Sequence, residues 1–104
     1  MKQFKDTNYY VTKCGKVFNK KGKELNQQIH NGRSSIYKRV KLYHNGMSKN
    51  YRIHRLVALV YLENPDKKKE VDHIDGDTFN NQLENLEWIT RSENQKRAIE
   101  RNKE

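Results

Sequence analysis

The chain has 104 residues, enough for one small domain, and only 33% of them are hydrophobic, so its core must be modest. The 22 Lys and Arg outweigh the 13 Asp and Glu, and the net charge of +9 makes nucleic acid the leading partner, although a basic surface that only aids solubility fits the charge alone about equally well. The single cysteine, Cys14, excludes an intramolecular disulfide and a zinc site built from paired cysteines. Neither a signal-peptide core nor a run of about 20 apolar residues is present, so we expect a cytoplasmic protein with no membrane partner.

The first half of the sequence predicts short β-strands. Residues 9–12 and 16–18 read as strands joined by a turn at Lys13-Cys14-Gly15. Residues 37–43 and 48–53 flank Asn45-Gly46, which is the preferred centre of a tight hairpin because both residues tolerate positive φ. This half is therefore expected to form an antiparallel β-meander.

Alternation along the second strand pair gives each of its faces a different character. Val40 and Leu42 share one face, with Tyr51 and Ile53 as candidate partners on the neighbouring strand. The opposite face carries three cations: Arg39, Lys41 and Arg52. One face is apolar and the other can approach phosphates.

The hydrophobic period changes after residue 53. Leu56, Leu59 and Val60 fit the stripe of a core-facing helix over residues 54–65, which Asn64-Pro65 should stop. A run of cations follows this helix: Lys67, Lys68 and Lys69. Such a run is usually a solvated loop, but here it stands directly before the next predicted strand and could help to hold phosphates.

The last third predicts a strand, a polar loop, a returning strand and a helix. The strands cover residues 70–74 and 87–90, and the helix begins near Ser92, where Thr90 with Glu93 or Ser92 with Gln95 can form a capping box. The loop lacks the spaced acidic ligands and terminal Glu of a calcium loop. Its polar residues are expected to brace turns: Asp75, Asp77, Asn80 and Asn81. Trp88 has the character of a core anchor rather than a base-stacking residue.

This segment resembles the HNH endonucleases of phages and mobile introns. Asp72-His73-Ile74-Asp75-Gly76, then Asn80-Asn81, then Asn85-Leu86-Glu87-Trp88 carry the resemblance, and the three positions that name the ββα-metal motif fall at His73, Asn85 and Asn94. Residues 51–58 and the amino-terminal strands also resemble the homing-type members. The resemblance implies an α+β fold in one domain, 1–104, with an accessory β-meander at 1–53, a linking helix at 54–65 and the ββα-metal motif at 70–104.

The resemblance also implies roles for four residues. His73 would be the general base, a task that suits an imidazole because its ordinary pKa lies near neutrality. Asp72 and Asn94 would hold one divalent metal, and Asn85 would brace the loop and aim His73 without touching the metal. Many family members carry histidine where Asn94 stands, and an oxygen donor here favours Mg²⁺, with Mn²⁺ able to substitute and no structural zinc expected.

The remaining histidines and the motif itself raise two structural questions. We expect structural roles for His30 and His44, whereas His54 fits either a structural hydrogen bond or the chemistry. Asp72 and His73 are adjacent, and adjacent side chains of a regular strand point to opposite faces. Both can serve one centre only if the strand ends or bulges there.

The expected function is hydrolysis of DNA phosphodiester bonds by nicking, in the host cell of a phage or mobile element. Phosphate contacts are expected from the cationic sheet face, the lysine run and the last helix, through Arg39, Lys41, Arg52, Lys67, Lys68, Lys69, Lys96, Arg97 and Arg101. Because such contacts carry no sequence information, we expect weak or short-site specificity, with targeting by a partner such as phage packaging proteins. A monomer or weak dimer is expected. A DNA-binding protein that keeps the fold but does not cleave is the main alternative, and action on RNA is another.

Overall fold

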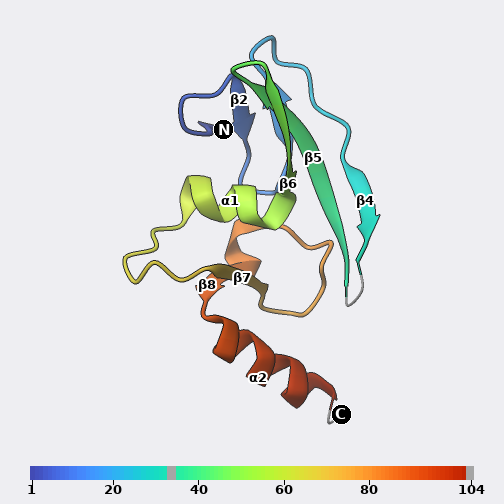
Figure 1. Ribbon diagram of the computed structural model, residues 1–104, viewed down its shortest axis with the longest axis vertical. Helices are drawn as coiled ribbons and strands as arrows, with labels where there is room; N and C mark the ends of the chain where they lie inside the picture. Colours follow the sequence, from blue (N-terminus) through green and yellow to red (C-terminus); the bar gives the residue numbers. More distant parts are fainter. Residues whose placement is uncertain (33–34, 103–104) are drawn as a thin grey trace.

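Two small antiparallel sheets, a central helix, a β-hairpin and a last helix make up the protein (Figure 1). This computed structural model describes residues 1–32 and 35–102, and the side chains of that part up to residue 100. The helix α1 lies between the amino-terminal sheets and the hairpin, so both sheets and the hairpin pack on it (Figure 1). The predicted α+β fold is confirmed.

The first sheet has the strand order β1-β2-β3, with bounds Lys2–Gln3, Tyr9–Val11 and Val17–Asn19. Its second and third strands match the prediction, while β1 is too short to leave a periodic signal. Gly15 closes the turn between β2 and β3 at φ +92°, and a Cβ there would lie 3.1 Å from side-chain atoms of both Ile53 and Asn81. This turn therefore packs directly against the start of α1 and the loop that follows β7.

The second sheet has the order β4-β5-β6, with bounds Gln28–Asn31, Ile36–His44 and Met47–Arg52. Asn45 (φ 52°) and Gly46 (φ 76°) form its turn, which confirms the predicted hairpin. Val40 pairs with Tyr51, while Arg39 pairs with Arg52, so the apolar and cationic faces are divided as expected. The predicted meander is thus two separate sheets, with β4 as an additional edge strand.

The helix α1 spans Ile53–Tyr61, so the prediction of a helix over 54–65 placed both of its ends wrongly. Ile53 is not a strand partner of Val40, because the chain turns at Arg52 and buries Ile53 completely as the first helical residue. The helix ends before Pro65 because the backbone is extended at Leu62. The Asn64 side chain then stabilises the following turn, since its Oδ1 accepts the backbone N–H of Lys68 at 2.9 Å and its Nδ2 donates to the carbonyl of Lys68 at 2.7 Å.

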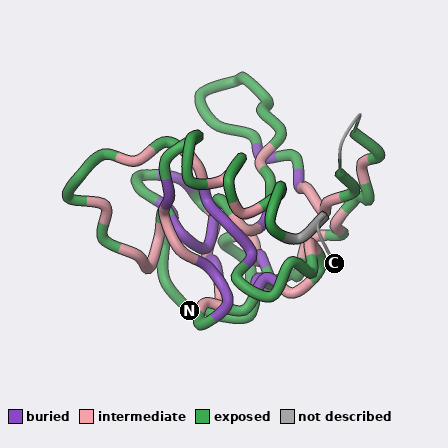
Figure 2. The backbone as a smooth tube through the Cα atoms, turned by 90° about the horizontal axis from the view of Figure 1, so that it is seen from below, coloured by how far each residue is buried: buried purple, intermediate pink, exposed green. Residues whose placement is uncertain are grey.

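The hydrophobic core surrounds α1 and is visible as the purple interior of Figure 2. It joins residues from both sheets, the helix and the hairpin: Phe4, Val11, Val17, Val40, Leu42, Ile53, Leu56, Val57, Ala58, Val71 and Leu86. Trp88 packs against this cluster and its Nε1–H donates to the carbonyl of Leu62 at 3.4 Å, as expected of a core anchor. Truncating a fully buried leucine such as Leu56 would cost about 2–5 kcal/mol.

The carboxy-terminal part begins with a hairpin of β7 (Glu70–His73) and β8 (Leu86–Ile89), joined by a polar loop and the short 3₁₀-helix η1 (Leu83–Asn85). The helix α2 follows at Arg91–Asn102, and the side chain of Arg101 lies outside the described residues. Thr90 and Glu93 form its capping box: Glu93 N–H donates to Thr90 Oγ1 at 3.1 Å and Thr90 N–H to Glu93 Oε1 at 3.2 Å. In the part of the chain described, neither helix is long and apolar enough to cross a membrane.

Candidate active site

The strand β7 presents its side chains to two helices. Its pairing with β8 is regular, one residue opposite one, and it ends at His73, whose carbonyl accepts the N–H of Gly76 at 2.8 Å. Val71 and His73 therefore share the face toward α1, whereas Glu70 and Asp72 share the face toward α2. The strand therefore ends at His73 and does not bulge there. The side chains of Asp72 and His73 point to opposite faces of the strand.

His73 is buried, with 7% of its surface exposed, and it is held by two neighbours. Its Nε2 lies 2.8 Å from Oδ1 of Asn81, which is itself buried, and its ring centroid lies 4.6 Å from that of His54. Because an amide oxygen can only accept a hydrogen bond, Nε2 is the donor in this contact. This partner was missed from the sequence, which predicted only a loop-bracing role for Asn81.

His54 is a neutral ring next to His73. Burial lowers its pKa from 6.5 to about 3, with further lowering by the positive charge that His73, Arg52 and Arg55 can carry. It occupies the first turn of α1, and its ring packs against the ring of His73 with 4.6 Å between the centroids. His54 therefore supports the His73 ring as an uncharged surface.

Asn85 and Asp75 shape the loop that follows His73. Asn85 Oδ1 accepts the N–H of Asp75 at 3.0 Å, and its Nδ2 donates to Asp75 Oδ1 and to the carbonyl of Asn80, both at 2.9 Å. The pKa of Asp75 is lowered, first by the Asn80 amide that donates to it and then by the backbone N–H of Asp77. Asn85 thus braces the backbone of the loop that follows His73.

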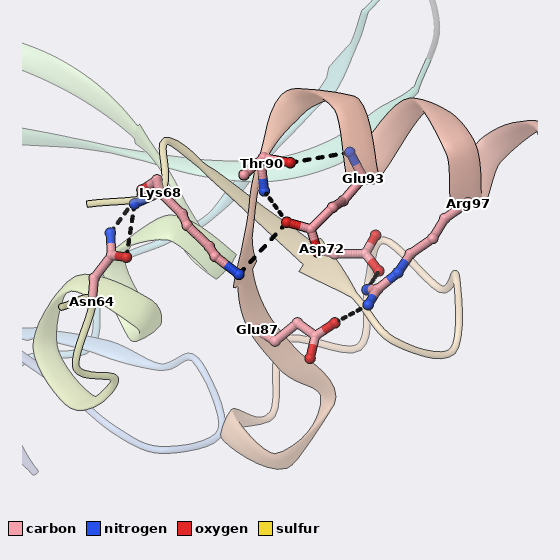
Figure 3. Close-up of polar contacts among 7 residues, drawn as sticks. All are labelled: Asn64, Lys68, Asp72, Glu87, Thr90, Glu93 and Arg97. Atoms are coloured by element: carbon pink, nitrogen blue, oxygen red, sulfur yellow. Dashed lines mark hydrogen bonds and ion pairs between the residues drawn. The ribbon is translucent and has the colours of Figure 1, made fainter. Parts of the chain in front are cut away.

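The α2 side of the hairpin carries the predicted metal ligands. Asp72 is 5% exposed and accepts a hydrogen bond from Arg97 Nη1 at 2.7 Å, while the other guanidinium nitrogen of Arg97 pairs with Glu87 (Figure 3). Asn94 Nδ2 donates to Glu70 Oε2 at 3.4 Å, which leaves its own oxygen as a donor to a cation. Hydrogen bonds from Arg97 to Asp72 and then to Glu87 raise the pKa of Arg97, so it stays protonated.

The donor set on this face fits a hard divalent cation. The carboxylates of Asp72 and Glu70 and the amide of Asn94 offer only oxygen, the ligand atom that Mg²⁺ prefers. Among the described residues, no three side chains of the His, Cys, Asp or Glu type converge into a closed metal cage. A cation here would thus keep positions open for water and phosphate.

A pocket of about 240 Å³ at the edge of β7 is lined by residues from both helices. His54 and Arg55 line it from α1 and Asn94 lines it from α2, with Arg52, Glu70 and Val71 completing the wall. Arg55 is fixed there, since its Nη1 donates to the carbonyl of Lys69 at 2.7 Å and its guanidinium lies 5.5 Å from the Trp88 ring. The two arginines make this pocket suitable for an anion beside the candidate ligands.

The predicted DNA contacts come from three elements. On the second sheet Lys41 and Arg52 are exposed, and Arg39 is half-buried beside Arg52. In the loop before β7, Lys67 and Lys69 are exposed, whereas Lys68 lies 3.5 Å from Glu93. On α2 Lys96 is exposed, but Arg97 is engaged by Asp72 and Glu87.

Comparison with known proteins shows what the chain is similar to. Residues 51–96 match the family model described as HNH endonuclease. The DNA endonuclease I-HmuI of Bacillus phage SP01 is 36% identical over 94 residues, which is 89% of this chain and 52% of the relative. A solved structure concerned with DNA binding and cleavage by the HNH homing endonuclease I-HmuI matches with a TM-score of 0.79 and 34% identity, over 95% of this chain and 55% of the other. Residues 51–96 of this chain are thus an HNH-like segment, similar to that of the phage homing enzyme.

The HNH match confirms the predicted resemblance to phage and homing enzymes. An uncharacterised HNH endonuclease of Acanthamoeba polyphaga mimivirus is also similar, at 41% identity over 90 residues, 86% of this chain and 26% of the relative. This chain spans about half the length of the phage relative and about a quarter of the mimivirus relative.

Proposed function

We propose that this protein is a metal-dependent DNA endonuclease that nicks one strand per active site. The observation that carries the proposal is the buried His73 ring, fixed by Asn81 at 2.8 Å within the segment that matches the HNH family. An imidazole that is held in place by an amide oxygen is well suited to act as a general base. The matching phage relative is named a DNA endonuclease, which supports DNA as the substrate.

His73 is the general base in this proposal. Its imidazole accepts a proton from the attacking water, while the hydrogen bond from Nε2 to Asn81 stabilises the resulting imidazolium. The uncharged His54 supports the ring, and Asn85 holds the loop that carries Asn81. Attack on phosphorus with departure of the 3′ oxygen leaves a 5′ phosphate and a 3′ hydroxyl.

Asp72 and Asn94 are the proposed ligands of one divalent cation, Mg²⁺ by preference and Mn²⁺ as a substitute. Asp72 on β7 and Asn94 in the first turn of α2 both lie on the side where the hairpin meets α2, which supports this assignment. The bound cation would polarise the scissile phosphate and stabilise charge on the departing 3′ oxygen.

Phosphate binding is proposed for the cations of the second sheet, the lysine loop and α2. The spread of these charges over three elements supports an extended contact with DNA that carries little sequence information. Targeting by a partner, phage packaging proteins among the candidates, and a monomeric or weakly dimeric state in the host cytoplasm complete the proposal.

One observation favours a second candidate, a DNA-binding protein that does not cleave. Asp72, a proposed ligand, is already paired with Arg97. If this pair never opens, the HNH fold would still bind DNA through its surface cations but would have no complete metal site.

Incubation of supercoiled plasmid with the protein and Mg²⁺ separates the two candidates. We expect nicked circles, loss of nicking with EDTA, and retention of nicking by His44→Ala, which changes an exposed histidine distant in sequence from the motif. A labelled RNA run in parallel should stay intact. Retardation of DNA in a gel without nicking under Mg²⁺ or Mn²⁺ would instead establish the binding protein.

A further inference from the structure

The helix α2 touches the hairpin through polar side chains. Among the side chains of residues 91–100, Asn94 and Arg97 are half-buried and the others are exposed, Ile99 at 59%. Asn94 and Arg97 are three positions apart and so share one face of the helix. Asn94 contacts Glu70. Arg97 contacts both Asp72 and Glu87 (Figure 3). Arg97 is thus the main charged contact that holds this helix on the hairpin.

Arg97 also supplies the positive charge that a buried carboxylate requires. Asp72 is 5% exposed, and an ionised carboxylate at that depth is costly unless a cation pairs with it. An arginine guanidinium stays protonated in proteins, so Arg97 cannot release Asp72 by losing its proton. A divalent cation on Asp72 would therefore meet a second, permanent cation on the same carboxylate.

Glu87 provides a place for Arg97 to remain when Asp72 is released. Asp72 and Glu87 are opposite each other in the β7-β8 register, so a small rotation of the guanidinium moves it from both carboxylates to Glu87 alone. Glu87 has 41% of its side chain exposed, so an arginine there costs little desolvation.

We propose that Arg97 and the divalent cation are alternative partners of Asp72, and that Arg97 must withdraw toward Glu87 before the metal site is complete. This inference rests on the proposed assignment of Asp72 and Asn94 as metal ligands. Removal of Arg97 should strengthen metal binding, because Asn94 does not depend on Arg97 for its position. Asn94 lies in the first turn of α2, fixed by the Thr90–Glu93 capping box and by the buried Ile89 before it.

The test is the dissociation constant for Mn²⁺, measured by electron paramagnetic resonance without DNA. Arg97→Gln removes the charge but keeps an amide, and it should bind Mn²⁺ about tenfold more tightly than the wild type, the value of one charge-assisted hydrogen bond to a carboxylate. Lys96→Gln removes the same charge from the adjacent, exposed position of α2 and should change the constant by less than about twofold. Arg97→Lys, which cannot bridge two carboxylates, should fall between the wild type and Arg97→Gln.

The outcomes separate this inference from the proposed function. Equal or weaker Mn²⁺ binding by Arg97→Gln, with the wild type binding normally, would overturn the exchange at Asp72 and leave the metal site standing. Failure of both proteins to bind Mn²⁺ would remove the metal site and the exchange together. If circular dichroism shows that Arg97→Gln folds only when Mn²⁺ is added, the metal replaces Arg97 as proposed. If Arg97→Gln does not fold at all, Arg97→Lys decides: tighter Mn²⁺ binding than the wild type supports the exchange, and equal or weaker binding overturns it.

Discussion

Replacing His54 by glutamine should make the protein less sensitive to acid. The pKa of His54 is about 3 in the folded protein and about 6.5 in the unfolded chain. Between these values the unfolded chain binds one more proton, so the contribution of neutral His54 is present above pH 6.5 and is lost as the pH falls toward 3. Each pH unit inside this window lowers the free energy of unfolding by about 1.4 kcal/mol.

If the His54 ring were fully shielded from water, the free energy of unfolding of the wild type would fall by about 2 kcal/mol between about pH 7.5 and pH 5. The ring is half-buried, so we expect about 1–2 kcal/mol. Asp75 and Glu93 also have lowered pKa values, but the stability that these carboxylates contribute is lost only as the pH falls below their unfolded values of 3.8 and 4.5. The range from about pH 5 to 7.5 therefore isolates histidine effects.

Urea unfolding at a series of pH values measures this effect directly. The free energy of unfolding of His54→Gln should vary less with pH than that of the wild type by about 1–2 kcal/mol over this range. His44→Gln changes an exposed histidine and should keep the wild-type dependence. Parallel pH profiles for the wild type and His54→Gln would refute the burial of a neutral His54 against His73.

Three further changes test individual contacts. Asn81→Leu removes the amide oxygen that accepts from Nε2 of His73, and it should cost about 1–3 kcal/mol in urea unfolding as well as most nicking activity. Asn81→Asp keeps an acceptor oxygen and should recover part of both. Equal losses for the two variants would argue against the hydrogen bond. Thr90→Ala should destabilise the protein by about 1 kcal/mol in thermal melts and Ser92→Ala by much less, because only the first residue caps α2. Asn85→Ala removes the amide that ties down the loop after β7, and hydrogen exchange there should accelerate while β7 itself stays protected.

Local patterns predicted those elements whose own residues determine them. Asn45-Gly46 specified the second-sheet hairpin, and Thr90 with Glu93 specified the start of α2. The strands β1 and β4 were not predicted, since each is formed by pairing with a neighbour rather than by its own periodicity. The end of α1 was predicted too late, because it depends on hydrogen bonds between the Asn64 side chain and the backbone of Lys68.

The order of residues in the motif predicted candidate site residues but not how their side chains contact one another. Asn80 and Asn81 are adjacent amides, and only the folded loop decides that Asn81 reaches His73 while Asn80 bonds Asp75. Arg97 was interpreted as a DNA contact because the sequence shows its positive charge but not its partner in the fold. Its pairing with Asp72 depends on the docking of α2, which no local pattern encodes.

The rate of single-turnover nicking by His73→Ala tests the central claim most directly. A radiolabelled duplex, excess protein and saturating Mg²⁺ isolate the chemical step from binding and product release. Loss of the general base should slow nicking by about 10²–10⁴-fold while the affinity for the duplex stays the same. A rate within a few-fold of the wild type would contradict the assignment of His73 as the base.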